Sequence, residues 1–452
     1  MKRTKRAVAL AAVATAAALA LSACSSDNQP NPSDSPTAQN ITLWLAGGDT
    51  PDSLRDWLKS EYNSRTGGVL TIEEQAWGDL VTKLTTSLPD ANNTPDVVEL
   101  GNTQSPTFTN VGAFSDISDL YTELGGANLL QSFVAAGAVD GKNYALPYYF
   151  GSRYMFYRKD IYAAAGVAQP TTLEEFNQAV LRLTQVNPNG IADFSGFFIG
   201  GQDWRNGISW IFANGGDLAQ KENGQWVMTL SDPNTIKGLQ QLQDIFQNAS
   251  KAPSTAKDES PWLYINDSDS TTDKAADGTE TDLPTSLAAA TIMAPGWAHW
   301  SIGDLVTVDG KPARQWNDDV FGVFALPGAD GQPAPVFAGG SNIGVSAASR
   351  NQEGARELLR IIFSADYQRM LGEQGLGPAN SLYVDSLGSD QFAQALIASA
   401  ANSKLTPAAP GWAGIEGSKL MEEFFSKIAQ GGDVVALAAE YDDVLTPMLN
   451  QR

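Results

Sequence analysis

Residues 41–100 alternate between two hydrophobic periodicities, and this order constrains the fold more than any other feature of the sequence. Period two is typical of a half-buried strand, and a period near 3.6 is typical of an amphipathic helix. The sequence predicts, in order, a strand at 41–45, a helix carrying Leu54, Leu58 and Tyr62, a strand at 69–75, a helix carrying Leu80, Leu84 and Leu88, and a strand at 96–100. This succession favours a parallel sheet with crossover helices, which is an α/β fold.

A second α/β unit is predicted to begin near residue 144. Thr172 and Glu175 form a capping-box pattern, which predicts a helix start. The remaining predictions are a helix from about 233, an exposed segment at 251–285, strands at 321–328 and 341–347, a helix carrying Ala355, Leu358, Leu359 and Ile362, and two C-terminal helices carrying Leu420, Phe424 and Ile428, then Leu437, Tyr441 and Leu445.

The first residues have the plan of a secretory signal. A basic start, MKRTKR, precedes an apolar run that is too short to span a membrane. Cys24, the only cysteine, follows Leu21-Ser22-Ala23, and this tetrapeptide resembles the lipobox of bacterial lipoproteins. A buried core cysteine is the alternative, but residues 25–40 contain almost nothing that packs. We therefore expect a signal peptide at 1–23, lipidation of Cys24, and a disordered tether at 24–40.

Charge and residue counts exclude several classes of protein. The formal net charge of −22 repels phosphate backbones, so we expect no nucleic-acid partner. His299 is the only histidine, which excludes sites built from several histidines. Asp267, Asp269 and Asp273 have a loosely calcium-like spacing, but the central Gly and final Glu of such a loop are missing, which favours a solvated acidic loop. We expect no metal and no cofactor.

Seven segments, in order, resemble extracellular solute-binding proteins of family 1, the sugar-capturing components of ABC importers related to maltose-binding protein. The resemblance covers most of residues 40–449. The segments are ITLWLAGGD, TPDVVELGN, ALPYYFGSRYMFYRKD, NGGDLAQKENGQWVMTLSDPN, AAATIMAPGW, FAGGSNIGVSAASRNQEGARELL and GPANSL.

The resemblance implies a two-lobed periplasmic-binding-protein fold of type II, in which each lobe is a mostly parallel sheet flanked by helices. A sugar binds in the cleft at the hinge. Lobe one is expected at 41–147 and 342–379, and lobe two at 148–341 and 380–452. The chain is expected to cross between the lobes near 146–151, 339–343 and 377–382.

Candidate ligand-binding residues lie where sheets of this kind bind ligands, after the carboxyl ends of strands. Sugars present hydroxyls that take hydrogen bonds and flat C–H faces that pack on aromatic rings. The candidates of lobe one are Asp49, Gln75, Trp77, Glu99, Asn102, Thr103 and Gln104. The candidates of lobe two and the crossings, placed by the resemblance, are Arg153, Trp204, Trp210, Trp297, Asn342 and Trp412. The APGWAHW segment is an aromatic-rich variant of the family's turn.

Each candidate also has a packing interpretation. Trp204 and Trp210 are equally well explained as core residues. Trp297 and Trp412 lie at loop or element ends and not on an obvious core stripe, which favours ligand contact. Glu99 has a local alternative, in which it caps or pairs with a neighbouring group.

These features predict a binding protein and not an enzyme: a monomeric lipoprotein on the outer face of the cell membrane that delivers a di- or oligosaccharide to ABC permease subunits. Two alternatives stay open. One is a lipid-anchored glycoside hydrolase, because tryptophan-rich clefts with carboxylates serve both roles. The other is a carbohydrate adhesin that has no transporter.

Overall fold

The computed structural model describes residues 39–257, 261–267, 288–308 and 311–451. Its first elements confirm the predicted alternation: β1 (Ile41–Ala46), α1 (Asp52–Thr66), β2 (Leu70–Gln75), α2 (Trp77–Ser87) and β3 (Val97–Gly101). β1 pairs in parallel with both β2 and β3. The two crossover helices explain this geometry, because parallel neighbours need a long connection.

Both faces of β1 are covered, which explains why nearly all of its residues are apolar. Leu43 packs in one core with Leu54 and Leu58 of α1. Trp44 points to the opposite face and packs in a second core with Leu80 and Leu84 of α2. The alternation of side chains along a strand therefore sends neighbouring residues into different cores.

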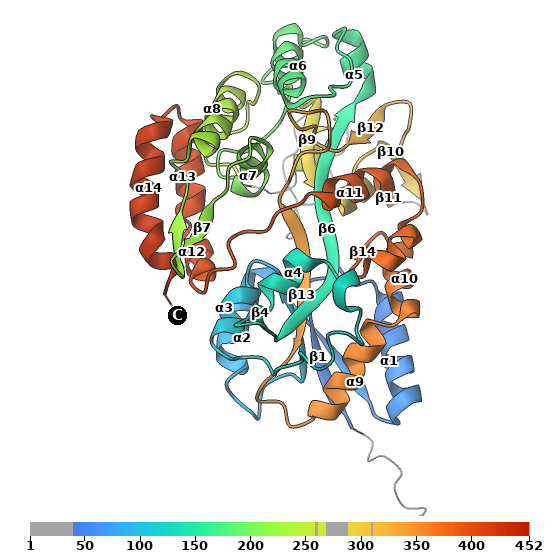
Figure 1. Ribbon diagram of the computed structural model, residues 1–452. Helices are drawn as coiled ribbons and strands as arrows, with labels where there is room; N and C mark the ends of the chain where they lie inside the picture. Colours follow the sequence, from blue (N-terminus) through green and yellow to red (C-terminus); the bar gives the residue numbers. More distant parts are fainter. Residues whose placement is uncertain (1–38, 258–260, 268–287, 309–310, 452) are drawn as a thin grey trace, which may run out of the picture. The chain divides into compact units, whose positions relative to one another are not determined.

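The central sheet is mixed, and its strands pair in the order β12-β6-β13-β3-β1-β2, with β9 and β14 also pairing with β6. β13 joins antiparallel to β3 on one side and to β6 on the other. Figure 1 shows β6 running through the sheet beside β13. The bounds of these strands are β6 (Ala145–Arg158), β9 (Thr291–Pro295), β12 (Phe321–Phe324), β13 (Ala338–Val345) and β14 (Gly377–Pro378).

The three segments predicted to cross between lobes lie side by side. Phe150 of β6 is in register with Gly340 of β13 on one side and with Gly377 of β14 on the other. Gly340 has a φ of +133°, and an added Cβ would lie 2.5 Å from the carbonyl oxygen of Tyr149. Only glycine therefore fits at this point of closest approach.

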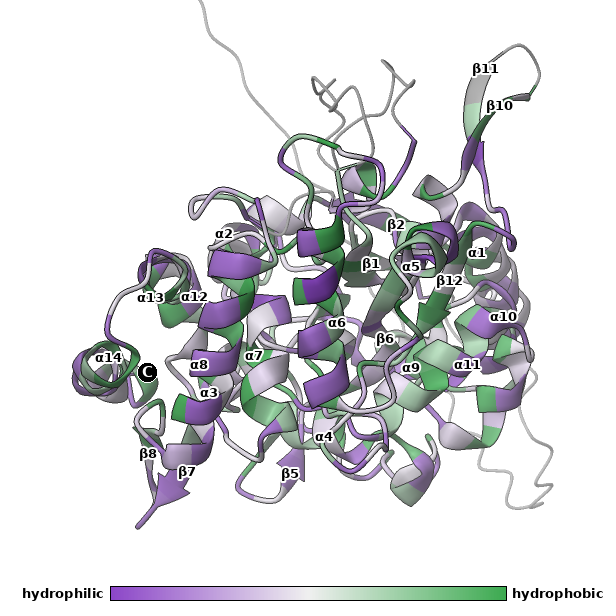
Figure 2. Ribbon diagram, turned by 90° about the horizontal axis from the view of Figure 1, so that it is seen from above, coloured by the Kyte–Doolittle hydropathy of each residue, from purple (hydrophilic) through white to green (hydrophobic). Residues whose placement is uncertain are grey.

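The second half of β6 also separates two cores. Met155 belongs to a core built with α6 (Leu173–Val186), α7 (Trp204–Ala213) and α8 (Pro233–Asn248), whereas Tyr154 faces a core that contains Trp262 and Ile292. Hydrophilic turns of α6 and α8 face the viewer in Figure 2. The core against α6 to α8 continues into the C-terminal helices α12 (Trp412–Ser418), α13 (Leu420–Ala429) and α14 (Val434–Leu449).

Most predicted helices are confirmed. Thr172 caps α6, where its hydroxyl accepts from the amide of Glu175 (3.2 Å). In a capping box, the Glu175 carboxylate would accept from the amide of Thr172. Here it accepts instead from the amide of the preceding residue, Thr171 (2.8 Å). The predicted apolar stripe of 355–362 is the buried face of α9 (Gln352–Ile362).

The prediction of an exposed segment at 251–285 is wrong for part of its length. Pro261, Trp262 and Leu263 of a short 3₁₀ helix, η2 (Pro261–Tyr264), are buried, and so is Ile265 directly after it, because this stretch packs into the core that contains Tyr154. Residues 258–260 and 268–285 of the predicted segment lie outside the described residues, as do Asp269 and Asp273.

The other described elements are short or lie at the edges. They are α3 (Ser105–Asn110), η1 (Gly126–Asn128), α4 (Gln131–Ala136), β4 (Ala138–Val139), β5 (Lys142–Asn143), α5 (Lys159–Ala164), β7 (Ala219–Glu222), β8 (Gln225–Met228), η3 (Gly296–Ser301), β10 (Asp304–Val308), β11 (Lys311–Gln315), α10 (Ala365–Glu373), η4 (Ser381–Leu387) and α11 (Gln391–Ala401). Among the described helices, none combines the length and the apolar character that a membrane crossing requires.

Candidate functional site

Asp49 and Trp77 meet at the carboxyl ends of β1 and β2. One carboxylate oxygen of Asp49 accepts from the indole nitrogen of Trp77 (3.2 Å) and from the hydroxyl of Tyr149 on β6 (2.9 Å). Gly47 makes room for this contact, because a Cβ there would lie 2.7 Å from the Trp77 nitrogen. Burial raises the pKa of Asp49, and the two hydrogen bonds oppose that shift.

Trp77 keeps a partly exposed ring, with 37% of its surface accessible. Its nitrogen is fixed by Asp49, so the accessible indole surface is held in one orientation. This combination of a fixed ring with an open face suits contact with the C–H face of a ligand. Tyr149 was absent from the predicted set, although it lies in the quoted ALPYYFGSR segment.

Glu99 is enclosed beneath this edge of the sheet. Its side chain on β3 is fully buried, and one carboxylate oxygen accepts from the amide of Ala46 on β1 (2.9 Å). Burial raises the pKa of Glu99 to about 8, and the bond from Ala46 opposes the shift. Burial therefore favours the protonated, neutral form of Glu99, and the bond from Ala46 agrees with the interpretation in which Glu99 pairs with a neighbouring group.

Four further candidates bind neighbouring parts of the fold. Gln75 accepts from the ammonium of Lys83 (2.9 Å), and Gln104 accepts from the amide of Gly101 (3.3 Å). The remaining contacts are made by two buried amides, whose nitrogens donate to main-chain carbonyl oxygens at 2.9 Å: Asn102 to Ala338, and Asn342 to Phe133. These bonds hold the loop after β3 and the strand β13 in place.

Arg153 lies on β6, directly before Tyr154 and Met155, which face the two cores described above. It is opposite Pro295 in the ladder between β6 and β9. Its guanidinium donates to the side-chain oxygen of Asn206 (3.1 Å), and the Asn206 nitrogen donates to Asp203 (2.6 Å). Asp203 also caps α7, so the helix start and the arginine share one network.

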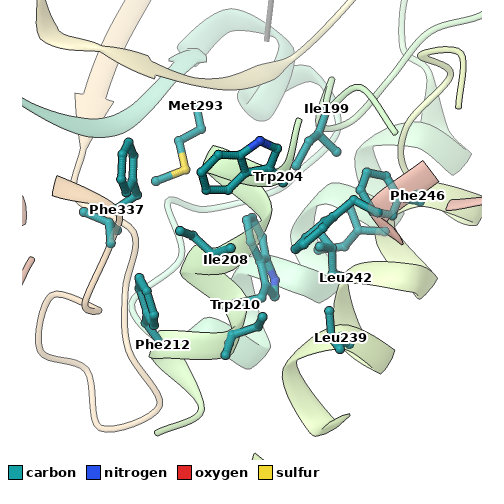
Figure 3. Close-up of a cluster of buried hydrophobic side chains, with 14 of the residues drawn as sticks. Ile199, Trp204, Ile208, Trp210, Phe212, Leu239, Leu242, Phe246, Met293 and Phe337 are labelled. Carbon is teal, nitrogen blue, oxygen red and sulfur yellow. The ribbon is translucent and has the colours of Figure 1, made fainter. Parts of the chain in front are cut away.

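Two of the predicted tryptophans lie deep in the core around α7. Trp210 is fully buried, and its nitrogen donates to Asn177 (3.1 Å). Figure 3 shows Trp204 and Trp210 from α7 among apolar side chains that include Ile208 and Leu242. The packing interpretation accounts for Trp210 completely, and we leave it out of the site proposed below.

Trp204 and Trp412 form a buried edge-to-face pair, with ring centroids 6.0 Å apart. Within the described residues, the indole nitrogen of Trp204 has no hydrogen-bond partner, whereas that of Trp412 interacts with the carboxylate of Glu416. The guanidinium of Arg205 lies 4.5 Å from the centre of the Trp204 ring. The Trp204 ring therefore lies beneath the guanidinium of Arg205, a side chain that is itself partly exposed.

Glu416 is a candidate that the sequence interpretation missed. One oxygen of its carboxylate accepts from the hydroxyl of Thr103 (3.2 Å), and the other lies 3.6 Å from Arg205. Burial raises the pKa of Glu416, and the charge of Arg205 opposes this. Glu416 follows Trp412 by four residues, so both occupy one face of α12, and that spacing was the available signal.

The loop after β3 and helix α3 therefore bind α12 and the segment before it. Besides the bond between Thr103 and Glu416, the hydroxyl of Thr107 donates to the carbonyl of Pro410 (2.9 Å). The two contacts join a part of the chain predicted in lobe one to a part predicted in lobe two. The first bond joins two side chains, and the second joins a side chain to a main-chain carbonyl.

Trp297 differs from the other tryptophans predicted for lobe two, because it is partly exposed. It lies on η3, directly after the carboxyl end of β9, with 49% of its surface exposed. Trp262 supports it edge-on, with ring centroids 4.8 Å apart. Its position at an element end matches the predicted one.

The described residues contain a cavity of about 210 Å³ away from these side chains. It is bordered by the β4–β5 turn on one side and by β7, β8 and the end of α14 on the other. No predicted site residue lines it; its lining is Asn110, Ala138, Val139, Asp140, Lys221, Gly224, Gln225, Trp226, Ala408, Pro410 and Asn450. Elsewhere in the described ranges, no group of three histidine, cysteine or acidic side chains is placed to hold a metal ion.

An α/β fold in which β6, β13 and β14 run side by side between two sets of helices defines a periplasmic-binding-protein fold. The chain belongs to a family described as bacterial extracellular solute-binding protein, whose profile matches residues 47–369. The protein is therefore an extracellular solute-binding protein, and its family is one of binders and not of enzymes.

Individual relatives agree with this assignment. The chain is 28% identical over 402 residues to the diacetylchitobiose binding protein DasA of Streptomyces coelicolor. The matched region covers 87% of each of the two chains. Two solved structures are similar in fold at 18% identity. They are the sugar-binding protein MalE of Xanthomonas citri (TM-score 0.71, 91% of this chain and 97% of that one) and the GacH receptor of Streptomyces glaucescens (TM-score 0.70, 91% and 99%).

Proposed function

We propose that the protein captures a di- or oligosaccharide between two lobes and delivers it to the permease of an ABC importer. One observation carries this proposal: two partly exposed indoles, Trp77 and Trp297, directly follow the carboxyl ends of β2 and β9, and the Trp77 nitrogen is bonded to the carboxylate of Asp49. Fixed aromatic faces combined with charged hydrogen-bonding groups are what a pyranose ring and its hydroxyls need.

The lobes of this proposal are residues 41–147 with 342–379, and residues 148–341 with 380–452. The ligand site comprises Asp49, Trp77, Thr103, Gln104 and Arg153, with Trp297 at its rim and Tyr149, Arg205 and Glu416 added by their contacts. The enclosed side chains of Glu99, Asn102 and Asn342 support the backbone around it. Similarity to a diacetylchitobiose binding protein over 87% of the chain favours a sugar as the solute.

A thermal-shift screen tests the proposal. A ligand that binds only the folded state adds about 2.7 kcal/mol at 100 times its dissociation constant, so a true ligand gives a clear rise in Tm. The panel contains chito-oligosaccharides, maltodextrins and common disaccharides, with free amino acids as the negative control. Stabilisation by amino acids and by no sugar would contradict the proposal.

The two alternatives have direct tests. A glycoside hydrolase would shorten chito- or malto-oligosaccharides during prolonged incubation, whereas a binder returns them intact. An adhesin would bind sugar without permease subunits, whereas an importer component stimulates the ATPase of its reconstituted permease when sugar is present.

We further propose that Cys24 carries a lipid that holds the protein at the outer face of the membrane. Cys24 and the tether at 24–40 lie outside the described residues, except for Gln39 and Asn40. Cys24→Ser is expected to release the protein into the medium with an unchanged Tm. Complete membrane retention of the variant would contradict this.

A further inference from the structure

The guanidinium of Arg55, near the start of α1, binds three groups at the edge of the sheet that carries Asp49. Its Nε donates to the carbonyl oxygen of Thr50 (2.7 Å), and one terminal nitrogen donates to the carbonyl oxygen of Gly47 (3.0 Å). The other terminal nitrogen forms an ion pair with Glu74 of β2 (2.9 Å). A planar guanidinium that uses all three nitrogens fixes its partners in direction as well as in distance.

The two carbonyl groups bound by Arg55 lie on either side of Asp49. Gly47 to Thr50 form the turn that joins β1 to α1, so Arg55 holds the main chain of this turn at both of its ends. Only 14% of the Arg55 side chain is accessible, which shields these bonds from water. The backbone that presents Asp49 is therefore fixed by a side chain from the helix that follows it.

Side chains of the same turn are held from β6. The hydroxyl of Tyr149 donates to Asp49 (2.9 Å), and the hydroxyl of Tyr148 lies 3.0 Å from that of Thr50 and 2.6 Å from that of Tyr367 on α10. Both hydrogen bonds to the Asp49 carboxylate, from Tyr149 and Trp77, end on Oδ2. The carboxylate therefore has a second oxygen, Oδ1, for a ligand hydroxyl.

Arg55 also supplies positive charge next to two enclosed carboxyl groups. Burial raises the pKa of Asp49, whereas the hydrogen bonds from Tyr149 and Trp77 and the charge of Arg55 lower it. Burial likewise raises the pKa of Glu99 to about 8, and Arg55 is among the groups that oppose this shift. The charged and titratable groups that act on Asp49 from the surrounding elements are Arg55 of α1, Glu74 of β2, Glu99 of β3 and Tyr149 of β6.

We propose that Arg55 is a positioning residue for sugar capture, which fixes the turn from Gly47 to Thr50 so that Asp49 presents one carboxylate oxygen to a sugar hydroxyl. This inference rests on the proposed sugar-binding function, in which Asp49 contacts the ligand. Arg55 acts through the turn, because its guanidinium is directed at protein groups. Its charge favours the ionised carboxylate, which accepts stronger hydrogen bonds than a neutral acid does.

The test compares Arg55→Lys and Arg55→Met by calorimetric titration with diacetylchitobiose and with maltotriose. Lysine keeps the charge but lacks the planar fork, and methionine keeps only the apolar stem. For a sugar that binds the wild-type protein, we expect about tenfold lower affinity in Arg55→Lys at pH 7, because a misplaced charge-assisted bond is lost, and a larger loss in Arg55→Met.

Arg65→Met is the matched control, because it removes the same side chain from the same helix. Arg65 lies about 15 Å further along α1 and pairs with Glu61 (2.7 Å), not with the turn. We expect it to keep the wild-type affinity.

A pH series separates positioning from a general loss of stability. Affinity is expected to fall on acidification, as Asp49 takes up a proton. Without the positive charge, the pKa of Asp49 rises, so in Arg55→Met this fall begins at a higher pH than in the wild-type protein. Arg55→Lys binds more weakly at every pH but falls at the wild-type pH. A purely structural role would lower the Tm without moving the profile.

The outcomes separate this inference from the function on which it rests. Wild-type affinity in both Arg55 variants, an equal loss in Arg65→Met, or an unmoved pH profile in Arg55→Met overturns the positioning role and leaves sugar capture intact. If Arg55→Met melts too early to titrate, Arg55→Lys decides. Failure of both variants to fold also overturns the inference, because Arg55 would then serve the fold as a whole. A wild-type protein that binds neither sugar overturns both.

Discussion

At the scale of single residues, Trp297 and Trp210 show that the fold places the same residue type in two different environments. Trp297 is half exposed at the end of β9, whereas Trp210 is enclosed and bonded to Asn177. A ligand contact and a core contact respond differently to truncation, because only the first depends on the ligand.

We predict that Trp297→Ala weakens sugar binding by about 2 kcal/mol, roughly 30-fold in Kd, with little change in Tm. Trp210→Ala is the matched comparison, and it is expected to lose about 3 to 5 kcal/mol of stability. Calorimetry and thermal denaturation of both variants check this. An early melt of Trp297→Ala with retained affinity would show that the indole belongs to the core.

Glu99 gives a second residue-scale prediction, because its pKa is about 8 against an ordinary value of 4.5. The folded state binds the proton more tightly, so this carboxyl contributes stability at low pH that is lost as pH rises from about 4.5 to about 8. Nearby Asp49 raises the pKa of Glu99 and Arg55 lowers it.

Glu99→Gln keeps an oxygen that accepts from Ala46 and removes the titration. Its free energy of unfolding is therefore expected to fall less than that of the wild-type protein between pH 5 and pH 8. Denaturant unfolding at a series of pH values measures the difference. Identical slopes for the two proteins would mean that Glu99 ionises normally.

At the scale of elements, the contact between β6 and β13 depends on Gly340. Its φ of +133° and the 2.5 Å approach to Tyr149 are incompatible with a side chain, so Gly340→Ala is expected to cost about 1 to 3 kcal/mol or more. Gly339→Ala is the control on the same strand, because its nearest atom would be 3.7 Å away. Denaturant titration compares them, and equal stability of the two variants would contradict the argument.

The elements themselves were largely predictable, because β1 to β3 and helices such as α6 and α9 depend on local periodicity and caps. The site was less predictable. Residue type and spacing do not distinguish Trp412, which is enclosed beside Trp204, from Trp297, which is open. Tyr149 and Glu416 were missed because their partners, Asp49 and Thr103, lie far away in the sequence.

At the scale of the whole molecule, three chain segments that are far apart in sequence pair at one place, around Phe150. A few crossing strands next to glycines allow two lobes to rotate relative to each other. The contacts between Thr103 and Glu416 and between Thr107 and Pro410 span the proposed lobes. Both contacts are polar, so their loss on opening costs little compared with the loss of an apolar core.

We therefore predict that a sugar found by the thermal-shift screen decreases the radius of gyration in small-angle scattering, because the ligand favours the state in which both lobes contact it. The shift in population reflects the difference in affinity between the two states, so it saturates with the binding curve. A sugar that leaves the Tm unchanged is the control and leaves the radius unchanged. A constant radius at full saturation with a true ligand would show that the strands around Phe150 form a rigid support and that capture occurs without closure.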